Sequence, residues 1–211
     1  MSPDMSTITG DIIHSRQFSD ASVWLDPLKK LLSAKGSSPE TWEIYRGDSF
    51  QVVAGPPEAL RTALQIKAVI RQVKHLDVRM AIGLGKKEEE RGGGGPSPIT
   101  ESTGDVFVRS GLLLDRLKQE KVHLAIESGD PGFDRELNMM LRLALAIFQT
   151  WSVNTAEVAG MLLAEPQLHQ KEIGRRLGIS QSSVSERIHR GALYEILALE
   201  AYYRERVQTL D

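Results

Sequence analysis

The sequence contains no cysteine in its 211 residues. This absence excludes disulfide bonds, thiolate nucleophiles and zinc sites that depend on cysteine ligands. Long apolar runs are missing as well, because the most apolar stretch, residues 141–151, is too short to cross a bilayer. Residues 1–9 lack the charged start and apolar run of a signal peptide. We therefore expect a cytoplasmic protein with no membrane partner.

A surplus of charge of one sign is also absent, since 26 Lys and Arg stand against 28 Asp and Glu and the formal charge is -2. Such a chain has no overall attraction to phosphate backbones, so any contact with nucleic acid must come from a local patch. The apolar fraction of 41% is typical of a globular protein, and the length allows either one large domain or two smaller ones. We favour two domains, at residues 1–130 and 152–211, joined by a helix at 133–151.

The first of these domains alternates between strand-like and helix-like patterns. Apolar and β-branched residues predict strands at 7–13, 42–45, 50–54, 77–84 and 122–126. Helical spacing of apolar residues predicts helices at 23–32, at 59–73 after two prolines, and at 106–117. Turn formers between the second and third strands predict a hairpin.

A charged run followed by four glycines and two prolines occupies residues 86–103. This segment has too little apolar surface to order itself, so we expect a mobile loop. A phosphate-binding glycine loop is the alternative, but no Gly-Lys-Ser or Gly-Lys-Thr follows the glycines. The helix predicted at 133–151 has apolar residues on nearly every side and is expected to be covered from two directions, either at the domain junction or in a dimer contact.

Residues 171–188 show the pattern of a helix-turn-helix. Apolar residues at 173, 177, 179, 184 and 188 match the core positions of two crossed helices. Gly174 keeps the first helix small at the crossing, Gly178 permits the tight turn, and Ser180 is placed to cap the second helix. The motif resembles the helix-turn-helix of sigma factors and response-regulator effector domains over about 35 residues.

The outward-facing residues of this motif predict contact with duplex DNA, because their polar ends could reach base edges or phosphates in a major groove. They are Gln181, Ser182, Ser185, Glu186, His189 and Arg190, with Arg175 and Arg176 expected to hold the backbone. A helical hairpin used for protein contact is the alternative. Residues 165–195 carry five Lys or Arg and four Glu, a local charge of 5 − 4 = +1, so one copy should bind weakly and we expect a homodimer. The apolar stripe at 193–207 is either its pairing surface or ordinary core.

Two acids in the first domain predict a site for a divalent cation such as Mg²⁺. Asp11 ends the first strand and Asp48 lies in the hairpin turn, so adjacent strands could bring both carboxylates to one ion. This layout resembles the palm-like catalytic domain of class III nucleotide cyclases and GGDEF proteins, and the resemblance implies an α+β, ferredoxin-like domain with metal ligands at these two positions. The alternative is that Asp48 only favours a turn and Asp11 only caps a loop.

A closer resemblance is to the SatD-like family of bacterial proteins. It rests on Ile-Thr-Gly-Asp-Ile-Ile-His-Ser-Arg at 8–16, Arg-Gly-Asp-Ser-Phe-Gln at 46–51, Ile-Gly-Leu-Gly at 82–85 and Gly-Asp-Val-Phe-Val-Arg-Ser-Gly at 104–111. The four blocks span much of the chain, and the resemblance implies a cyclase-like α/β domain followed by a helix-turn-helix.

The cyclase likeness is weakest in the residues that would carry catalysis. Cyclases place an Asn and an Arg four residues apart on a helix, whereas this chain has Phe107 and Gly111 there, with Arg109 out of register. Arg16, Arg46 and Arg109 could bind the phosphates of a nucleotide without turning it over. The sequence thus favours a transcriptional regulator that senses a nucleotide or phosphate ligand, with a Mg²⁺-dependent cyclase or nucleotidyltransferase, or a plain dimerisation platform, as the alternatives.

Overall fold

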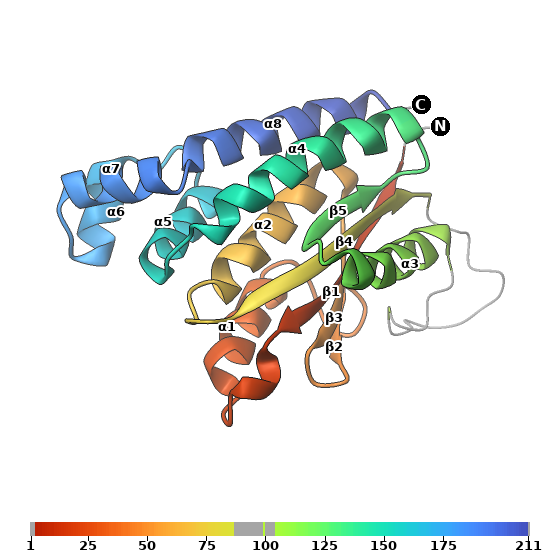
Figure 1. Ribbon diagram of the computed structural model, residues 1–211, viewed down its shortest axis with the longest axis horizontal. Helices are drawn as coiled ribbons and strands as arrows, with labels where there is room; N and C mark the ends of the chain where they lie inside the picture. Colours follow the sequence, from red (N-terminus) through yellow and green to blue (C-terminus); the bar gives the residue numbers. More distant parts are fainter. Residues whose placement is uncertain (1–2, 87–98, 100–103, 211) are drawn as a thin grey trace.

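The computed structural model describes residues 3–86, 99 and 104–210, and its described part is a mixed α+β protein (Figure 1). The strands are β1 (Met5–Ile13), β2 (Trp42–Tyr45), β3 (Ser49–Ala54), β4 (Asp77–Gly85) and β5 (Leu124–Glu127). The α-helices are α1 (Ser22–Ser33), α2 (Ala59–Ile70), α3 (Asp105–Glu120), α4 (Pro131–Gln149), α5 (Val153–Ala164), α6 (Gln170–Leu177), α7 (Gln181–Arg190) and α8 (Leu193–Gln208). Single 3-10 turns occur at η1 (Ser15–Gln17) and η2 (Pro56–Glu58).

The strands form one sheet in the order β2-β3-β1-β4-β5. The pairs within β2-β3-β1-β4 are antiparallel, and β5 runs parallel to β4. The central strand β1 sets Asp11 opposite Ser49 on β3 and opposite Arg79 on β4. This register fixes which side chains share a face at the end of β1, since a slip of one residue would turn them to the other face.

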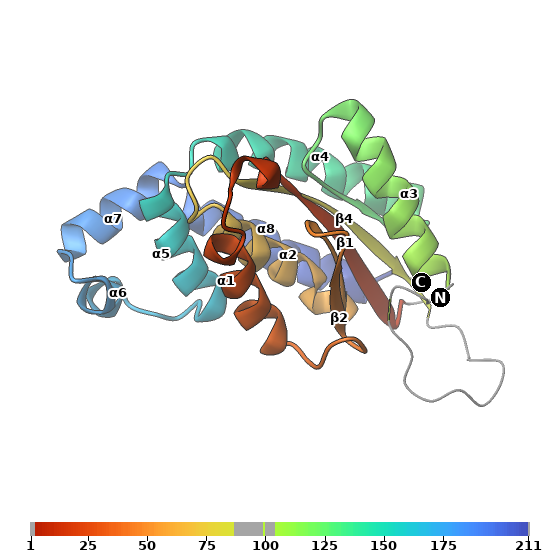
Figure 2. The same ribbon diagram turned by 90° about the horizontal axis from the view of Figure 1, so that it is seen from below.

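Helices cover both faces of the sheet. Thr9 on β1 and Ser110 on α3 share a hydrogen bond of 2.8 Å, which places α3 on the face of Thr9. The preceding residue on β1, Ile8, points to the other face and belongs to the main hydrophobic core together with Leu28 of α1 and Leu64 of α2. Figure 2 shows α3 on one side of the sheet and α1 and α2 on the other.

The C-terminal helices pack onto the sheet region instead of forming a separate core. One hydrophobic cluster extends from Ile8 of β1 to Leu210 after α8. Helix α5 lies against α2, where the Gln65 amide donates to the Leu163 carbonyl at 3.0 Å, and the Tyr203 hydroxyl of α8 donates to the Pro56 carbonyl at 2.7 Å. The regions 1–130 and 152–211, expected as two domains, therefore share one core.

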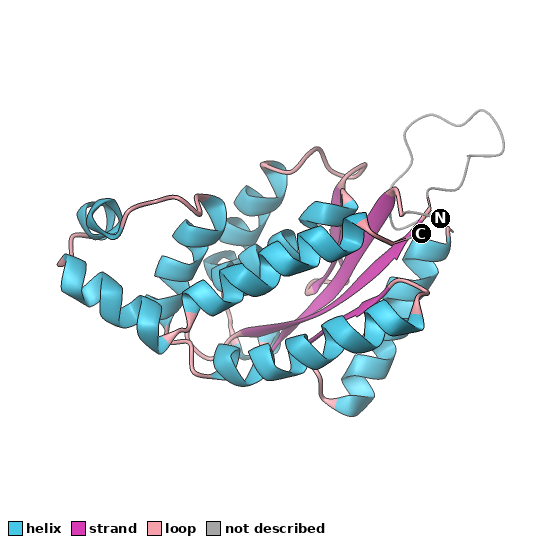
Figure 3. Ribbon diagram, turned by 90° about the horizontal axis from the view of Figure 1, so that it is seen from above, coloured by secondary structure: helices cyan, strands magenta, loops and turns pink. Residues whose placement is uncertain are grey.

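Helices α4 and α8 lie on the same side of the sheet (Figures 1 and 3). Only one stripe of α4 is buried, with Leu137 and Leu141 at its centre, while Met139 and Leu143 are 60% and 68% exposed. Within one chain α4 is therefore covered from one side, and the dimer contact expected as the alternative cover stays a prediction. The apolar stripe of α8 is ordinary core, because its buried members pack in the main cluster.

No helix in the described part of the chain is long and apolar enough to cross a membrane. Most of the segment expected as a mobile loop, residues 86–103, including the glycine run considered for phosphate binding, lies outside the described residues. Helix α8 begins at Leu193, the first residue of the apolar stripe at 193–207, and Ala192 separates it from α7 with a left-handed backbone at φ 46°.

Candidate functional site

Helices α6 and α7 are joined by a tight turn, and we refer to residues 170–190 as the α6–α7 unit. Gly178 ends α6 in a left-handed conformation with φ 66°, which favours glycine. A Cβ on Gly174 would lie 2.7 Å from the Ile179 carbonyl oxygen, so the close approach of α6 to the turn requires glycine there. The Ser180 hydroxyl accepts the backbone N–H of Ser183 at 3.1 Å, which confirms the predicted cap.

The unit lies at the end of the molecule that is farthest from the two chain termini (Figure 1). Its inner face is apolar, because Ile173 of α6 and Val184 and Ile188 of α7 are buried in the main core. Its outer face carries all eight predicted DNA-contacting residues, and each of them is exposed: Arg175, Arg176, Gln181, Ser182, Ser185, Glu186, His189 and Arg190. The structure thus brings these residues to one end of the protein.

The arginines of α6 are paired with glutamates of the same chain. Arg175 lies 2.7 Å from Glu172, and Arg176 lies 2.6 Å from Glu165 and 2.9 Å from Glu172. Hydrogen bonds from Arg175 and then Arg176 lower the pKa of Glu172 to about 2. Exposed pairs of this kind contribute little to stability and exchange easily, so a phosphate could replace a glutamate as the partner of either guanidinium.

Arg190 and Glu186 form an ion pair one turn apart on α7. Both side chains are more than half exposed, so the pair projects from the helix into solvent. The carboxylate of Glu186 opposes phosphate contact at this position, whereas it could accept a hydrogen bond from a base amino group. Helix α7 accordingly presents a mixed, hydrogen-bonding surface with little net positive charge.

The α6–α7 unit is fixed to the rest of the protein through Trp151, between α4 and α5. The Trp151 indole N–H donates to the Gly191 carbonyl at 3.0 Å, directly after α7. Its own carbonyl accepts a hydrogen bond from Arg71 at the end of α2. Arg187 of α7 further pairs with Glu157 of α5 at 3.2 Å. These contacts hold the unit in a defined orientation relative to the sheet.

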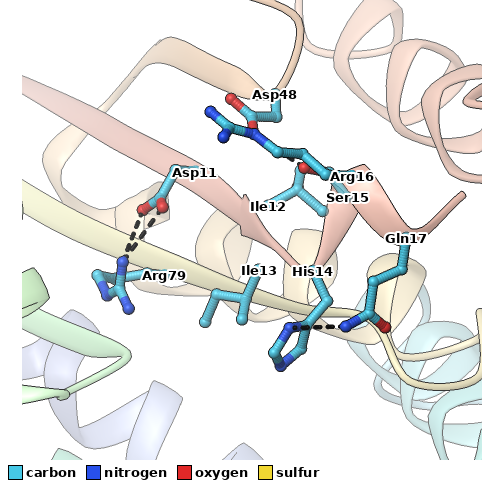
Figure 4. A pocket seen from close by; sticks show the side chains of 9 residues that line it. All are labelled: Asp11, Ile12, Ile13, His14, Ser15, Arg16, Gln17, Asp48 and Arg79. Atoms are coloured by element: carbon cyan, nitrogen blue, oxygen red, sulfur yellow. Dashed lines mark hydrogen bonds and ion pairs between the residues drawn. The ribbon is translucent and has the colours of Figure 1, made fainter.

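A second candidate site is a pocket of about 400 Å³ where β1 ends and the chain turns into η1 (Figure 4). His14 makes this turn with a left-handed backbone at φ 68°. The hairpin turn between β2 and β3 reaches the same place, because the Ile12 N–H donates to the Asp48 carbonyl at 2.9 Å. The lining residues are Asp11, Ile12, Ile13, His14, Ser15, Arg16, Gln17, Asp48 and Arg79.

Both predicted metal ligands line this pocket, and each has a partner in the protein. The Asp11 carboxylate accepts hydrogen bonds from Arg79 Nη1 at 3.1 and 3.4 Å. The Asp48 carboxylate accepts the Ser15 hydroxyl at 2.8 Å. In Figure 4 the Asp11 side chain is directed at Arg79 on the neighbouring strand, and the two carboxylates do not point towards each other.

A magnesium ion shared by these carboxylates would fit this arrangement poorly. Mg²⁺ requires near-octahedral coordination by oxygen, whereas the position beside both Asp11 oxygens is taken by a guanidinium. Among the described residues no group of three or more His, Asp or Glu side chains is placed to hold a metal ion. The pocket is lined by two guanidinium groups, from Arg16 and Arg79, and by the carboxylates of Asp11 and Asp48, so its formal charges balance. An anionic ligand would depend on direct contact with the guanidinium groups.

The three arginines expected to bind a ligand are not brought together. Arg16 lines the pocket, and Arg46 is exposed in the hairpin turn with φ 52° but does not line it. Arg109 points to the opposite end of β4, where it donates to the carbonyls of Leu84 and Ser128. The structure therefore gives Arg109 a supporting position between α3, β4 and the chain after β5.

Arg79 lines the pocket, although the sequence does not predict it as a site residue. The one indication in the sequence is that Arg79 stands between the buried residues Val78 and Met80 of the predicted strand, so its side chain must face away from theirs. Which residue it meets depends on the register between β1 and β4, and that register is set by packing across the sheet. Ser15, which binds Asp48, gave no signal beyond its place after the first strand.

These features define a mixed α+β protein with an exposed two-helix unit at one end and a polar pocket at the end of its central strand. A search of the curated proteins finds no match. The SatD family model matches residues 5–211, which is nearly the whole sequence. The chain therefore belongs to the SatD family.

Proposed function

We propose that this protein is a DNA-binding transcriptional regulator in which the α6–α7 unit is a helix-turn-helix and α7 reads the major groove. The observation that carries the proposal is the tight turn at Gly178, which leaves the polar face of α7 free at the end of the molecule. A helix of this diameter fits the major groove, and its Gln, Ser, His and Arg side chains can contact base edges or phosphates. The protein would act in the cytoplasm.

The second part of the proposal is that residues 1–130 form a ferredoxin-like, cyclase-like region that senses a nucleotide or phosphate ligand. The connection β1-α1-β2-β3-α2-β4 with the order β2-β3-β1-β4 supports this, because it is the arrangement expected of that fold. The pocket at the end of β1 has a volume suited to a small ligand. Arg16 and Arg79 would bind the anionic groups of the ligand.

A homodimer is the form in which we expect this protein to bind DNA. The arginines of the α6–α7 unit are paired with glutamates, so a single copy gains little from phosphate neutralisation. Two copies would double the contacts on a palindromic site. The stripe of α8 is not available for pairing because it is buried within the chain, so the dimer contact lies elsewhere.

The DNA-binding proposal is tested with Gln181→Ala and Arg190→Ala in a gel-shift titration at fixed salt. Each substitution should weaken binding to a cognate duplex roughly tenfold, since one base or phosphate contact contributes about 1–3 kcal/mol. Gln119→Ala and Arg116→Ala are matched controls, because both side chains are exposed on α3, which packs on β1, β4 and β5 and not on the α6–α7 unit. Unchanged affinity in both test variants would contradict the assignment of α7 as the recognition helix.

Thermal unfolding in the presence of nucleotides tests the ligand proposal. A ligand that binds only the folded protein raises the unfolding temperature, and Arg16→Ala should remove that shift. Incubation with nucleoside triphosphates and Mg²⁺ or Mn²⁺ distinguishes sensing from catalysis. A product that disappears in Asp48→Asn would establish an enzyme in place of a sensor.

A further inference from the structure

The Asp11 carboxylate and the Arg79 guanidinium are held together by the sheet itself. β1 and β4 pair without interruption over nine residues of β1, and Asp11 stands directly opposite Arg79 in that register. The side chains meet on one face, with Arg79 Nη1 at 3.1 Å from one carboxylate oxygen and 3.4 Å from the other. Because the backbone fixes both partners, the contact does not depend on a flexible loop.

Both partners are partly buried. The Asp11 side chain is 21% exposed and the Arg79 side chain 15%. A partly buried carboxylate loses some of its hydration, and a positive partner compensates for that loss. A guanidinium is charged at every physiological pH. Arg79 thus meets the electrostatic demand of Asp11 from inside the protein.

We propose that Arg79 is the resident cation of the pocket, that it occupies the position beside Asp11 which a divalent metal ion would need, and that the pocket binds its ligand without such an ion. This inference rests on the proposed function only in treating the pocket as a ligand site. A metal ion at Asp11 would have to displace the guanidinium from both carboxylate oxygens, and the two cations would repel each other. The anionic groups of the ligand would meet Arg79 and Arg16 directly.

The test is a titration of the full-length protein with Mn²⁺, in which the electron paramagnetic resonance signal measures the concentration of the free ion. Mn²⁺ prefers the same oxygen ligands as Mg²⁺. Wild type should leave the signal of free Mn²⁺ unchanged. Arg79→Met keeps much of the side-chain volume and should bind one Mn²⁺ ion at least roughly tenfold more tightly than wild type does. Adding Asp11→Asn to Arg79→Met should abolish that binding.

Arg116→Met is the matched control. Arg116 pairs with Glu127 at 2.5 Å outside the pocket, so its removal also frees a carboxylate but leaves the pocket unchanged. This control should behave as wild type does. Circular dichroism establishes whether each variant folds, and Arg79→Gln replaces Arg79→Met if the latter does not.

Two results would overturn the inference. One is that the wild-type protein binds Mn²⁺ and that Asp11→Asn abolishes this binding; this result can be obtained without an Arg79 variant. The other is a folded Arg79 variant that gains no Mn²⁺ binding. DNA binding is not measured in this experiment, so either result leaves the helix-turn-helix proposal in place.

Discussion

The Trp151 indole N–H donates to the Gly191 carbonyl oxygen at 3.0 Å, and this bond joins the α4–α5 junction to the turn between α7 and α8. Trp151 is buried and packs edge-on against Phe148 of α4, with ring centroids 5.0 Å apart. The residue therefore connects the helix that lies over the sheet to the end of the proposed recognition helix. A regulator that transmits a ligand signal to DNA needs a contact of this kind.

Trp151→Phe should destabilise the protein by about 1–3 kcal/mol more than a control substitution that loses only ring volume, because the buried Gly191 carbonyl would lose its donor. Trp24→Phe is that control, since Trp24 is equally buried and its indole N–H has no hydrogen-bond partner among the described residues. Urea unfolding of both variants gives the difference. Equal losses in the two variants would show that the Trp151 hydrogen bond contributes nothing.

Lys67 and Asp77 form a buried ion pair of 2.5 Å between α2 and β4, in which the lysine side chain is 2% exposed. Asp77→Asn should lower the free energy of unfolding at pH 7 by about 3–5 kcal/mol, because it leaves the ammonium buried without a counter-ion. The double variant Lys67→Met with Asp77→Asn should recover most of that loss. A double variant as unstable as Asp77→Asn alone would contradict the explanation.

Stability should also fall in acid because of Asp77. Burial alone would raise its pKa, but a hydrogen bond from His123 and the charge and hydrogen bond of Lys67 outweigh burial and hold the pKa well below its usual value. A group whose pKa is lower in the folded state stabilises the protein above its unfolded pKa, which is about 4, and this contribution is lost as the pH falls further. Unfolding between pH 5 and about pH 2 should therefore show a weaker pH dependence in Asp77→Asn than in wild type.

Gly174→Ala and Gly111→Ala should have opposite effects on stability. A Cβ at Gly174 would lie 2.7 Å from the Ile179 backbone, so alanine there should force the α6–α7 turn open and reduce DNA binding. A Cβ at Gly111 meets nothing within 4 Å, and alanine inside α3 should stabilise the protein by about 0.5–1 kcal/mol. Urea unfolding and DNA titration of the pair measure both effects. Normal stability and DNA binding in Gly174→Ala would contradict the close approach.

Local patterns in the sequence located the secondary structure within a few residues. Strand alternation and helical spacing depend on near neighbours in the chain, so β1, α2 and β4 were predicted close to their observed ends. The Gly178 turn and the Ser180 cap were also visible for this reason. The left-handed backbone at Ala192 has no local signal, because alanine is a common helix residue and rarely adopts that conformation.

Contacts between distant segments could not be predicted in the same way. The Asp11–Arg79 pair depends on the register of two strands that are more than sixty residues apart in the chain, and Arg109 was assigned to a ligand although it supports the carbonyls of Leu84 and Ser128. The shared core of the two predicted domains depends on how α5 and α8 dock onto α2. Such docking is set by the fit of whole surfaces, which no local pattern contains.

The most direct test of the central claim is binding of the purified full-length protein to duplex DNA from upstream of its own coding sequence, with a scrambled duplex of the same composition as competitor. Anisotropy titrations at fixed salt would be run with and without a panel of nucleotides. We expect the protein to bind the upstream duplex, the scrambled duplex to leave that complex intact, and one nucleotide to strengthen or weaken the binding. Equal affinity for both duplexes, or no binding under any condition, would contradict the proposal that α7 reads DNA.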